Sequence, residues 1–76
     1  MRILLAEDEA MMAEPIMTYL GWHGHQTDWA ENGLKALEMA FSNAYDCLIL
    51  DVMMPCMDGV SVLKQIRREG SDVPAI

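Results

Sequence analysis

Short, continuous apolar runs alternate along the chain with segments that repeat hydrophobic residues at helical spacing. The two most apolar runs, residues 3–6 and 47–50, are typical of strands buried on both faces of a parallel sheet. The more polar run 25–30 favours a strand at the edge of the sheet. Residues 73–76 resemble the start of a fourth strand, in which Pro74 favours an edge or a first strand position.

Three helical patterns lie between these runs. Pro15 lies past the first turn of the first, so we expect a kink or a late start, and Gly21 or Gly24 should end that helix. Asn32 is the expected N-cap of the second helix, and Gly70 the expected stop of the third. The predicted buried faces are Met12, Ile16, Tyr19 and Leu20, then Leu34, Leu37 and Phe41, then Val62, Leu63 and Ile66.

The order β-α-β-α-β-α-β predicts an α/β fold with a parallel sheet and right-handed crossovers. The two most apolar strands should be central, and the second strand should lie outside the first. The predicted spatial order is therefore 2-1-3-4. With 76 residues, the chain has room for one small domain.

Charge and cysteine content exclude several classes of function. Twelve acidic against five basic residues give a net charge of −7, which disfavours direct contact with nucleic acid or an anionic membrane surface. No run approaches the roughly 20 apolar residues that span a bilayer, and acids follow the first apolar run too soon for a signal peptide. Two cysteines are too few for a disulfide framework, so we expect a cytoplasmic protein.

Acidic residues follow two of the predicted strands. Glu7 and Asp8 come directly after the first strand, and Asp51 comes directly after the third. Neighbouring parallel strands lie about 4.8 Å apart, so these carboxylates should converge where the winding of the sheet reverses. Acids at strand ends also cap helices, but three at this one point favour a site for a hard cation such as Mg²⁺.

The loop after Asp51 strengthens this interpretation. Pro55 stiffens the loop, and Gly59 permits a turn that most residues would resist. A stiff loop can hold the backbone carbonyl of Met53 toward a metal beside Asp51. An ordinary strand-to-helix turn is the alternative that Pro and Gly alone leave open.

Several segments resemble the receiver domains of two-component response regulators. They are residues 3–9 (ILLAEDE) and 48–59 (LILDVMMPCMDG), together with Gly24-His25 and residues 30–37 (AENGLKAL). The resemblance covers the whole chain. It implies a flavodoxin-like (βα)n sheet, the fold whose strand order begins 2-1-3.

The resemblance also implies roles for individual residues. Asp51 would be the phosphoacceptor, taking a phosphoryl group from the phosphohistidine of a sensor histidine kinase. Asp8 would bind Mg²⁺ directly, and Glu7 directly or through water, at a position where the family more often has Asp. The Met53 carbonyl would be a further ligand.

One departure from the family pattern concerns length. Receivers have about five βα units, so residues 1–76 correspond to the N-terminal two-thirds of a single receiver domain. The family completes its site with a hydroxyl residue after the fourth strand and a lysine after the fifth. Neither position is present in residues 1–76. Lys35 and Lys64 lie on predicted helices, so they cannot replace the missing lysine. We therefore expect impaired phosphorylation of this chain.

Three other classes of function compete with this interpretation. An aspartate-nucleophile phosphatase would carry a second acid two residues after its nucleophile, where this chain has Met53. A nucleotide- or flavin-binding module would need a phosphate-binding loop after the first strand, where residues 7–9 would repel phosphate. The third class is an assembly fragment without a signalling role, and the sequence leaves it as an alternative.

An incomplete sheet should also promote self-association. The outer edge at residues 73–76 lacks a partner strand, and we expect parts of Ile3, Leu5 and Ile49 to face water. A homo-oligomer that covers the open sheet face or edge is the predicted form.

The remaining residues of chemical interest have structural interpretations. We expect packing roles for Trp22 and Trp29, helix-face packing for Met11, Met12, Met17 and Met39, a core position for Cys47 and an exposed position for Cys56, and no metal site at His23 and His25.

Overall fold

The centre of the structure is a parallel sheet of three strands in the order β2-β1-β3. The computed structural model describes all residues 1–76. The strands are β1 (Arg2–Ala6), β2 (Gln26–Ala30) and β3 (Cys47–Leu50). Their register pairs Leu5 with both Trp29 and Ile49. The predicted α/β class, flavodoxin-like topology and inner strand order are confirmed.

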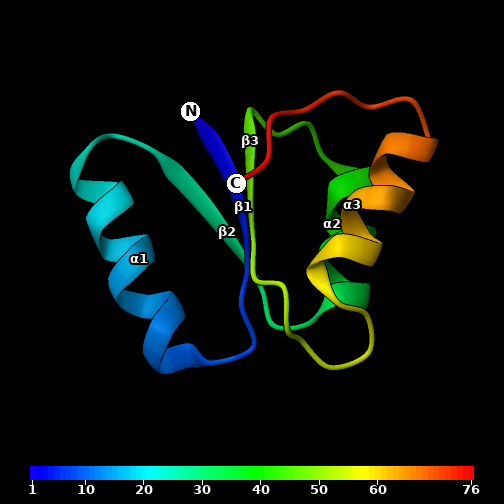
Figure 1. Cartoon of the computed structure of the whole chain (residues 1–76). Helices are drawn as coiled ribbons and strands as arrows, with labels where there is room; N and C mark the ends of the chain where they lie inside the picture. Colours follow the sequence, from blue (N-terminus) through cyan, green and yellow to red (C-terminus); the bar gives the residue numbers. More distant parts are fainter.

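Helices cover both faces of this sheet. They are α1 (Ala10–Trp22), α2 (Gly33–Ser42) and α3 (Gly59–Arg68). Figure 1 shows α1 alone on one face, with α2 and α3 side by side on the other. None of the three combines the length and the hydrophobicity that a membrane-spanning helix needs.

The predicted fourth strand lies where it was expected, outside β3, but it forms a single bridge between Leu48 and Ala75. The Leu48 N–H donates to the Pro74 carbonyl at 2.8 Å, and the Ile76 N–H donates to the Leu48 carbonyl at 2.9 Å. Pro74 has no N–H of its own to add to the ladder. The segment therefore follows β3 without forming a regular strand.

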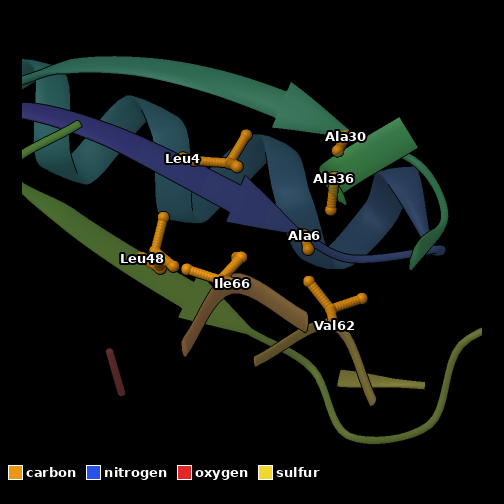
Figure 2. Close-up of a cluster of buried hydrophobic side chains, with 7 residues drawn as sticks. All are labelled: Leu4, Ala6, Ala30, Ala36, Leu48, Val62 and Ile66. Carbon is orange, nitrogen blue, oxygen red and sulfur yellow. The ribbon is translucent and has the colours of Figure 1, made fainter. Parts of the chain in front are cut away.

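The main hydrophobic core lies between the sheet and the pair α2 and α3 (Figure 2). Three of its members are alanines, which let the helices approach the sheet closely, while larger side chains fill the space around them. The cluster consists of Leu4, Ala6, Ala30, Ala36, Leu48, Val62 and Ile66.

The opposite face is better covered than the sequence suggested. Ile3 is 3% exposed and Leu5 is 2% exposed, so the expectation that they face water is wrong. The reason is that α1 packs on this face with its buried residue Ala13. Ile49, on β3, is only half-buried.

The predicted helix faces are correct for α3 and only partly correct elsewhere. Val62 and Ile66 are buried, as expected, and Leu63 is half-buried. In α2 the fully buried residues are small: Ala36 belongs to the core, and Gly33 lies against the Met57 backbone, while Leu37 is half-buried against the core. Four residues that were expected to be buried are instead exposed: Met12, Tyr19, Leu34 and Phe41.

Helix α1 differs most from expectation. It begins at Ala10, well before Pro15, so a late start is wrong. Trp22 is 79% exposed and Met11 is 87% exposed, so neither packs against the protein. A helix that contacts a sheet on one side leaves its other side in water, and these residues lie there. Gly24, with φ +81°, follows the end of the helix.

The predicted signals at the other helix ends are confirmed. The Asn32 side chain accepts a hydrogen bond from the Lys35 N–H at 2.8 Å, which makes it the N-cap of α2. Gly70, just past α3, has φ +90°, and its N–H donates to the Arg67 carbonyl at 3.0 Å.

A polar network ties the strands together at the amino end of the sheet. Arg2 forms a salt bridge with Asp28 at 3.1 Å, and its guanidinium lies 5.1 Å from the ring centroid of Tyr45. The Tyr45 hydroxyl donates to the same Asp28 carboxylate at 2.7 Å. Burial, and then this hydrogen bond, raise the pKa of Tyr45 to about 12.

Candidate functional site

Three carboxylates converge at the carboxyl end of the sheet. Glu7 and Asp8 follow β1, and Asp51 follows β3, the neighbouring strand. One carboxylate oxygen of each lies within 4.8 Å of the others. The hydrogen bonding between β1 and β3 continues to the site, because the Asp51 N–H donates to the carbonyl of Ala6 at 3.0 Å. The predicted meeting of these residues at one edge is therefore observed.

The backbone of Glu7 is held by the end of β2. Its N–H donates to the Ala30 carbonyl at 3.0 Å, and its carbonyl accepts from the indole Nε1–H of Trp29 at 2.7 Å. Its carboxylate accepts a longer hydrogen bond, 3.3 Å, from the Glu9 N–H. The N–H and the carbonyl of Glu7 are thus both held by hydrogen bonds to β2, which fixes the position of its backbone at the site.

The cluster holds three acidic side chains and no basic side chain that pairs with them. Partial burial raises the pKa of the Glu7 carboxyl, and the nearby charges of Asp51 and Asp8 raise it further, while the Glu9 N–H lowers it. The only salt bridge of the chain, Arg2–Asp28, involves none of the three acids. A group of hard oxygen donors without a basic partner fits a divalent cation such as Mg²⁺.

The loop of residues 52–58 forms a second wall of the site. The Gly59 N–H donates to the Val52 carbonyl at 2.9 Å, and a Cβ atom on Gly59 would overlap the backbone carbonyl of Asp51. This close approach explains the requirement for glycine there. A cavity of about 460 Å³ opens beside the loop, lined by Asp8, Val52, Met53, Met54, Pro55 and Asp58. Metal binding by the Met53 carbonyl stays a prediction.

Two helix ends hold this loop in place. Gly33, the first residue of α2, lies against the backbone of Met57 so closely that a Cβ atom would overlap the Met57 carbonyl. Asp58 caps α3, accepting hydrogen bonds from the Ser61 N–H at 2.8 Å and the Ser61 hydroxyl at 3.1 Å. These hydrogen bonds lower the pKa of Asp58.

Other candidate residues lie apart from the cluster. Lys35 and Lys64 lie on α2 and α3, as predicted; both are exposed, and neither forms a salt bridge. The Nδ1 atom of His25 lies 3.1 Å from the amino group of Met1. Cys56 is exposed, as expected, and has φ +72°.

Two residues that shape the site were not predicted from the sequence. Trp29 was expected only to pack, and Gly33 was not singled out. The sequence placed both residues in predicted elements. It does not show that the Trp29 indole contacts the Glu7 carbonyl, or that the Met57 backbone lies against Gly33.

The comparisons with known proteins agree on one family. A sequence model of the family described as "Response regulator receiver domain" matches residues 3–76. The response regulator MprA of Mycobacterium avium (strain 104) is 40% identical over 76 residues, which are 100% of this chain and 33% of the relative. The chain thus spans about a third of the length of the curated relatives that it matches.

Solved structures show the same similarity. The response regulator TrrA from Thermotoga maritima, in complex with Mg²⁺–BeF, matches with a TM-score of 0.92 and 39% identity, over 97% of this chain and 64% of that one. The same protein in complex with the histidine kinase ThkA matches with a TM-score of 0.90, 39% identity and the same coverage.

Proposed function

The chain belongs to the response regulator receiver domain family, and on that premise we propose that Asp51 accepts a phosphoryl group from the phosphohistidine of a sensor histidine kinase. The observation that carries the proposal is the convergence of Glu7, Asp8 and Asp51 without a basic partner. Three converging carboxylates repel one another, so such an arrangement favours a bound cation.

We assign Mg²⁺ to this cluster, with Asp8 and Asp51 as direct ligands, Glu7 as a direct or water-mediated ligand, and the Met53 carbonyl as a further ligand. The donor set supports Mg²⁺, since all of these atoms are hard oxygens. When bound, the ion would neutralise the charge that develops on the phosphoryl oxygens.

The chemical step is a phosphoryl transfer between two protein side chains. An oxygen of the Asp51 carboxylate attacks phosphorus in line with the bond to the imidazole nitrogen of the donor. The new P–O bond makes an acyl phosphate, and the electron pair of the broken P–N bond stays on the imidazole. Asp8 is exposed and lines, with Val52, the cavity beside the loop that follows Asp51, and we propose that a donor approaches the acceptor from this side.

The partner we propose is a sensor histidine kinase. TrrA, similar over nearly all of this chain, has been solved in complex with the histidine kinase ThkA. The charge of −7 makes direct contact of this chain with nucleic acid unfavourable. Residues 1–76 would act as the N-terminal two-thirds of one receiver domain, consistent with their match to 64% of the TrrA chain.

For the 76-residue chain by itself, we expect slow or undetectable labelling. Residues 1–76 include neither the hydroxyl residue that follows a fourth strand nor the lysine that follows a fifth, and neither Lys35 nor Lys64 forms a salt bridge. A transferred phosphoryl group would therefore lack a cationic side chain to stabilise it.

Calorimetry with Mg²⁺ tests the metal assignment. Weak binding by the parent chain should be lost in Asp8→Asn and kept in the control Asp72→Asn, which changes an exposed aspartate outside the cluster. Equal binding by Asp8→Asn and the parent would refute the assignment.

Labelling with acetyl phosphate, or with a phosphorylated kinase, tests the acceptor. Any label should disappear in Asp51→Asn, while Asp72→Asn should behave as the parent. Robust, stable labelling of another residue would contradict the assignment of Asp51 and the expected impairment together.

We further propose that the 76-residue chain self-associates through its outer edge. Ala75 makes no backbone hydrogen bond with the rest of the chain on that side, so its N–H and C=O can pair with a second copy. An apolar hollow of about 150 Å³ lies beside it, lined by Leu50, Val52, Gly59, Val60, Leu63, Ala75 and Ile76. A two-fold dimer would cover both features.

Sedimentation equilibrium at micromolar concentration tests this association. Added salt should strengthen it by screening the net charge of −7. A monomer whose stability does not depend on protein concentration would exclude the dimer.

A further inference from the structure

We propose that Trp29 is a positioning residue for the acidic cluster, and that it acts through the hydrogen bond from its indole Nε1–H to the backbone carbonyl of Glu7. This bond is 2.7 Å long, the shortest hydrogen bond made by any residue of the cluster. No role in the site follows from the family resemblance for this position.

The location of Trp29 makes this bond possible. Trp29 is the fourth residue of β2 and pairs in register with Leu5 of β1. Its neighbour Ala30 belongs to the core under α2 and α3, so the Trp29 side chain points to the opposite face, toward α1. There the half-buried indole extends past the end of β1 to the first residue of the acidic loop.

The carbonyl that accepts this bond has a special position. It belongs to the peptide unit that joins Glu7 to Asp8, two of the three residues of the cluster. Because a peptide unit is planar, fixing its carbonyl direction also fixes the directions in which both residues leave it. One side chain on β2 thus orients two carboxylates at once.

The loop needs such an anchor. Residues 7–9 are consecutive acids that repel one another, and no regular secondary structure covers Glu7 or Asp8. The Glu7 N–H is held by the Ala30 carbonyl at 3.0 Å, and the Trp29 indole holds the other side of the residue. Without the indole, the Glu7–Asp8 peptide could rotate while the strand pairing stayed intact.

The test compares the same substitution at the two tryptophans of the chain. Trp29→Phe keeps an aromatic ring and removes the N–H donor, whereas Trp22→Phe makes the identical change at a 79% exposed residue of α1. In metal-free samples, NMR should show shifts of the Glu7 carbonyl carbon and the Asp8 amide in Trp29→Phe. The spectrum of Trp22→Phe should keep both resonances at their parent positions.

Metal binding gives the second readout, and only this part rests on the proposed function. Mg²⁺ affinity should fall about threefold to tenfold in Trp29→Phe, the range expected for one hydrogen bond, and should be unchanged in Trp22→Phe. Ile66→Val, which trims the core away from the cluster, controls for a general loss of stability and should also keep the parent affinity. If the parent binds no Mg²⁺, the metal assignment fails while the metal-free spectra still decide the role of Trp29.

A third measurement needs no change at Trp29, in case Trp29→Phe does not fold. In Trp22→Phe the only indole is that of Trp29, and its Nε1–H should exchange slowly with solvent. Fast exchange would overturn the proposal, as would Glu7 and Asp8 resonances that remain unchanged in a folded Trp29→Phe chain. Equal Mg²⁺ affinity of Trp29→Phe and Trp22→Phe would overturn it as well.

Discussion

Gly33 lies directly against the backbone carbonyl of Met57, with no space between them for a Cβ atom. Gly33→Ala must therefore move either the start of α2 or the loop beside Asp51. We expect this substitution to lower the stability of the chain and to shift the amide resonances of residues 52–58. The measurement is chemical denaturation together with NMR of the metal-free chain.

The matched control is Gly21→Ala. Gly21 lies within α1, and a Cβ atom there would meet nothing within 4 Å. Alanine is favoured over glycine in a helix, so this variant should gain about 0.5–1 kcal/mol. Equal effects of the two substitutions would show that the contact with Met57 places no constraint on the loop.

The pKa of Glu7 predicts a pH dependence of the metal-free chain. Because burial and the nearby acids raise this pKa in the folded state, the contribution of Glu7 to stability is fully present below its ordinary pKa of 4.5 and is lost as pH rises through the folded value. Glu7→Gln should therefore be more stable than the parent at pH 7. The two free energies of unfolding should converge at low pH, and a constant difference across the pH range would contradict a raised pKa at Glu7.

The N-cap of α2 offers a test of local stability. Asn32→Ala removes the acceptor for the Lys35 N–H and should cost about 1 kcal/mol. Asn32→Asp keeps an acceptor at the same place and should stay close to the parent. Thermal or denaturant unfolding measures both, and an unaffected Asn32→Ala would mean that the cap contributes nothing to stability.

Cys56 lies in a backbone conformation that suits glycine. With φ +72° it is the only non-glycine residue of the chain at positive φ, which costs an ordinary residue about 1–2 kcal/mol. Cys56→Gly should therefore raise the free energy of unfolding, although the flexibility of glycine in the unfolded chain offsets part of the gain. Cys47→Gly, the same change within β3, should lower it.

The pKa of Tyr45 reports on the polar network of Arg2, Asp28 and Tyr45 at the amino end of the sheet. In a Tyr19→Phe chain, the remaining tyrosine should titrate at about 12 in a spectrophotometric titration. Adding Asp28→Asn removes the charge beside the hydroxyl, and the pKa of Tyr45 should fall toward its ordinary value of 10.0. An unchanged titration would show that burial alone sets this pKa.

The strand ends were the most predictable part of the molecule. Two apolar runs and the acids that follow them determine which residues reach one edge of a parallel sheet, so Glu7, Asp8 and Asp51 could be placed together from the sequence alone. Local signals at helix ends, such as Asn32, were equally direct because they act within a few residues.

Packing distances were not predictable in the same way. The helical pattern assigned Leu34 and Phe41 to the core, but the residues of α2 that are fully buried are Ala36, in the core, and Gly33, against the Met57 backbone. Hydrophobic periodicity says which residues can be buried, whereas the separation of helix and sheet decides which ones are. The reach of Trp29 to Glu7 depends on the same three-dimensional separations.

The wide sequence separation of the three acids has a thermodynamic consequence. Asp51 meets Glu7 and Asp8 only through the pairing of β3 with β1, so an unfolded chain does not contain the cluster. A cation that binds the cluster would bind the folded state alone and would shift the folding equilibrium by mass action. A chelator would then act on this small domain as a mild denaturant, and the concentration of free cation would help to set how much of the chain is folded.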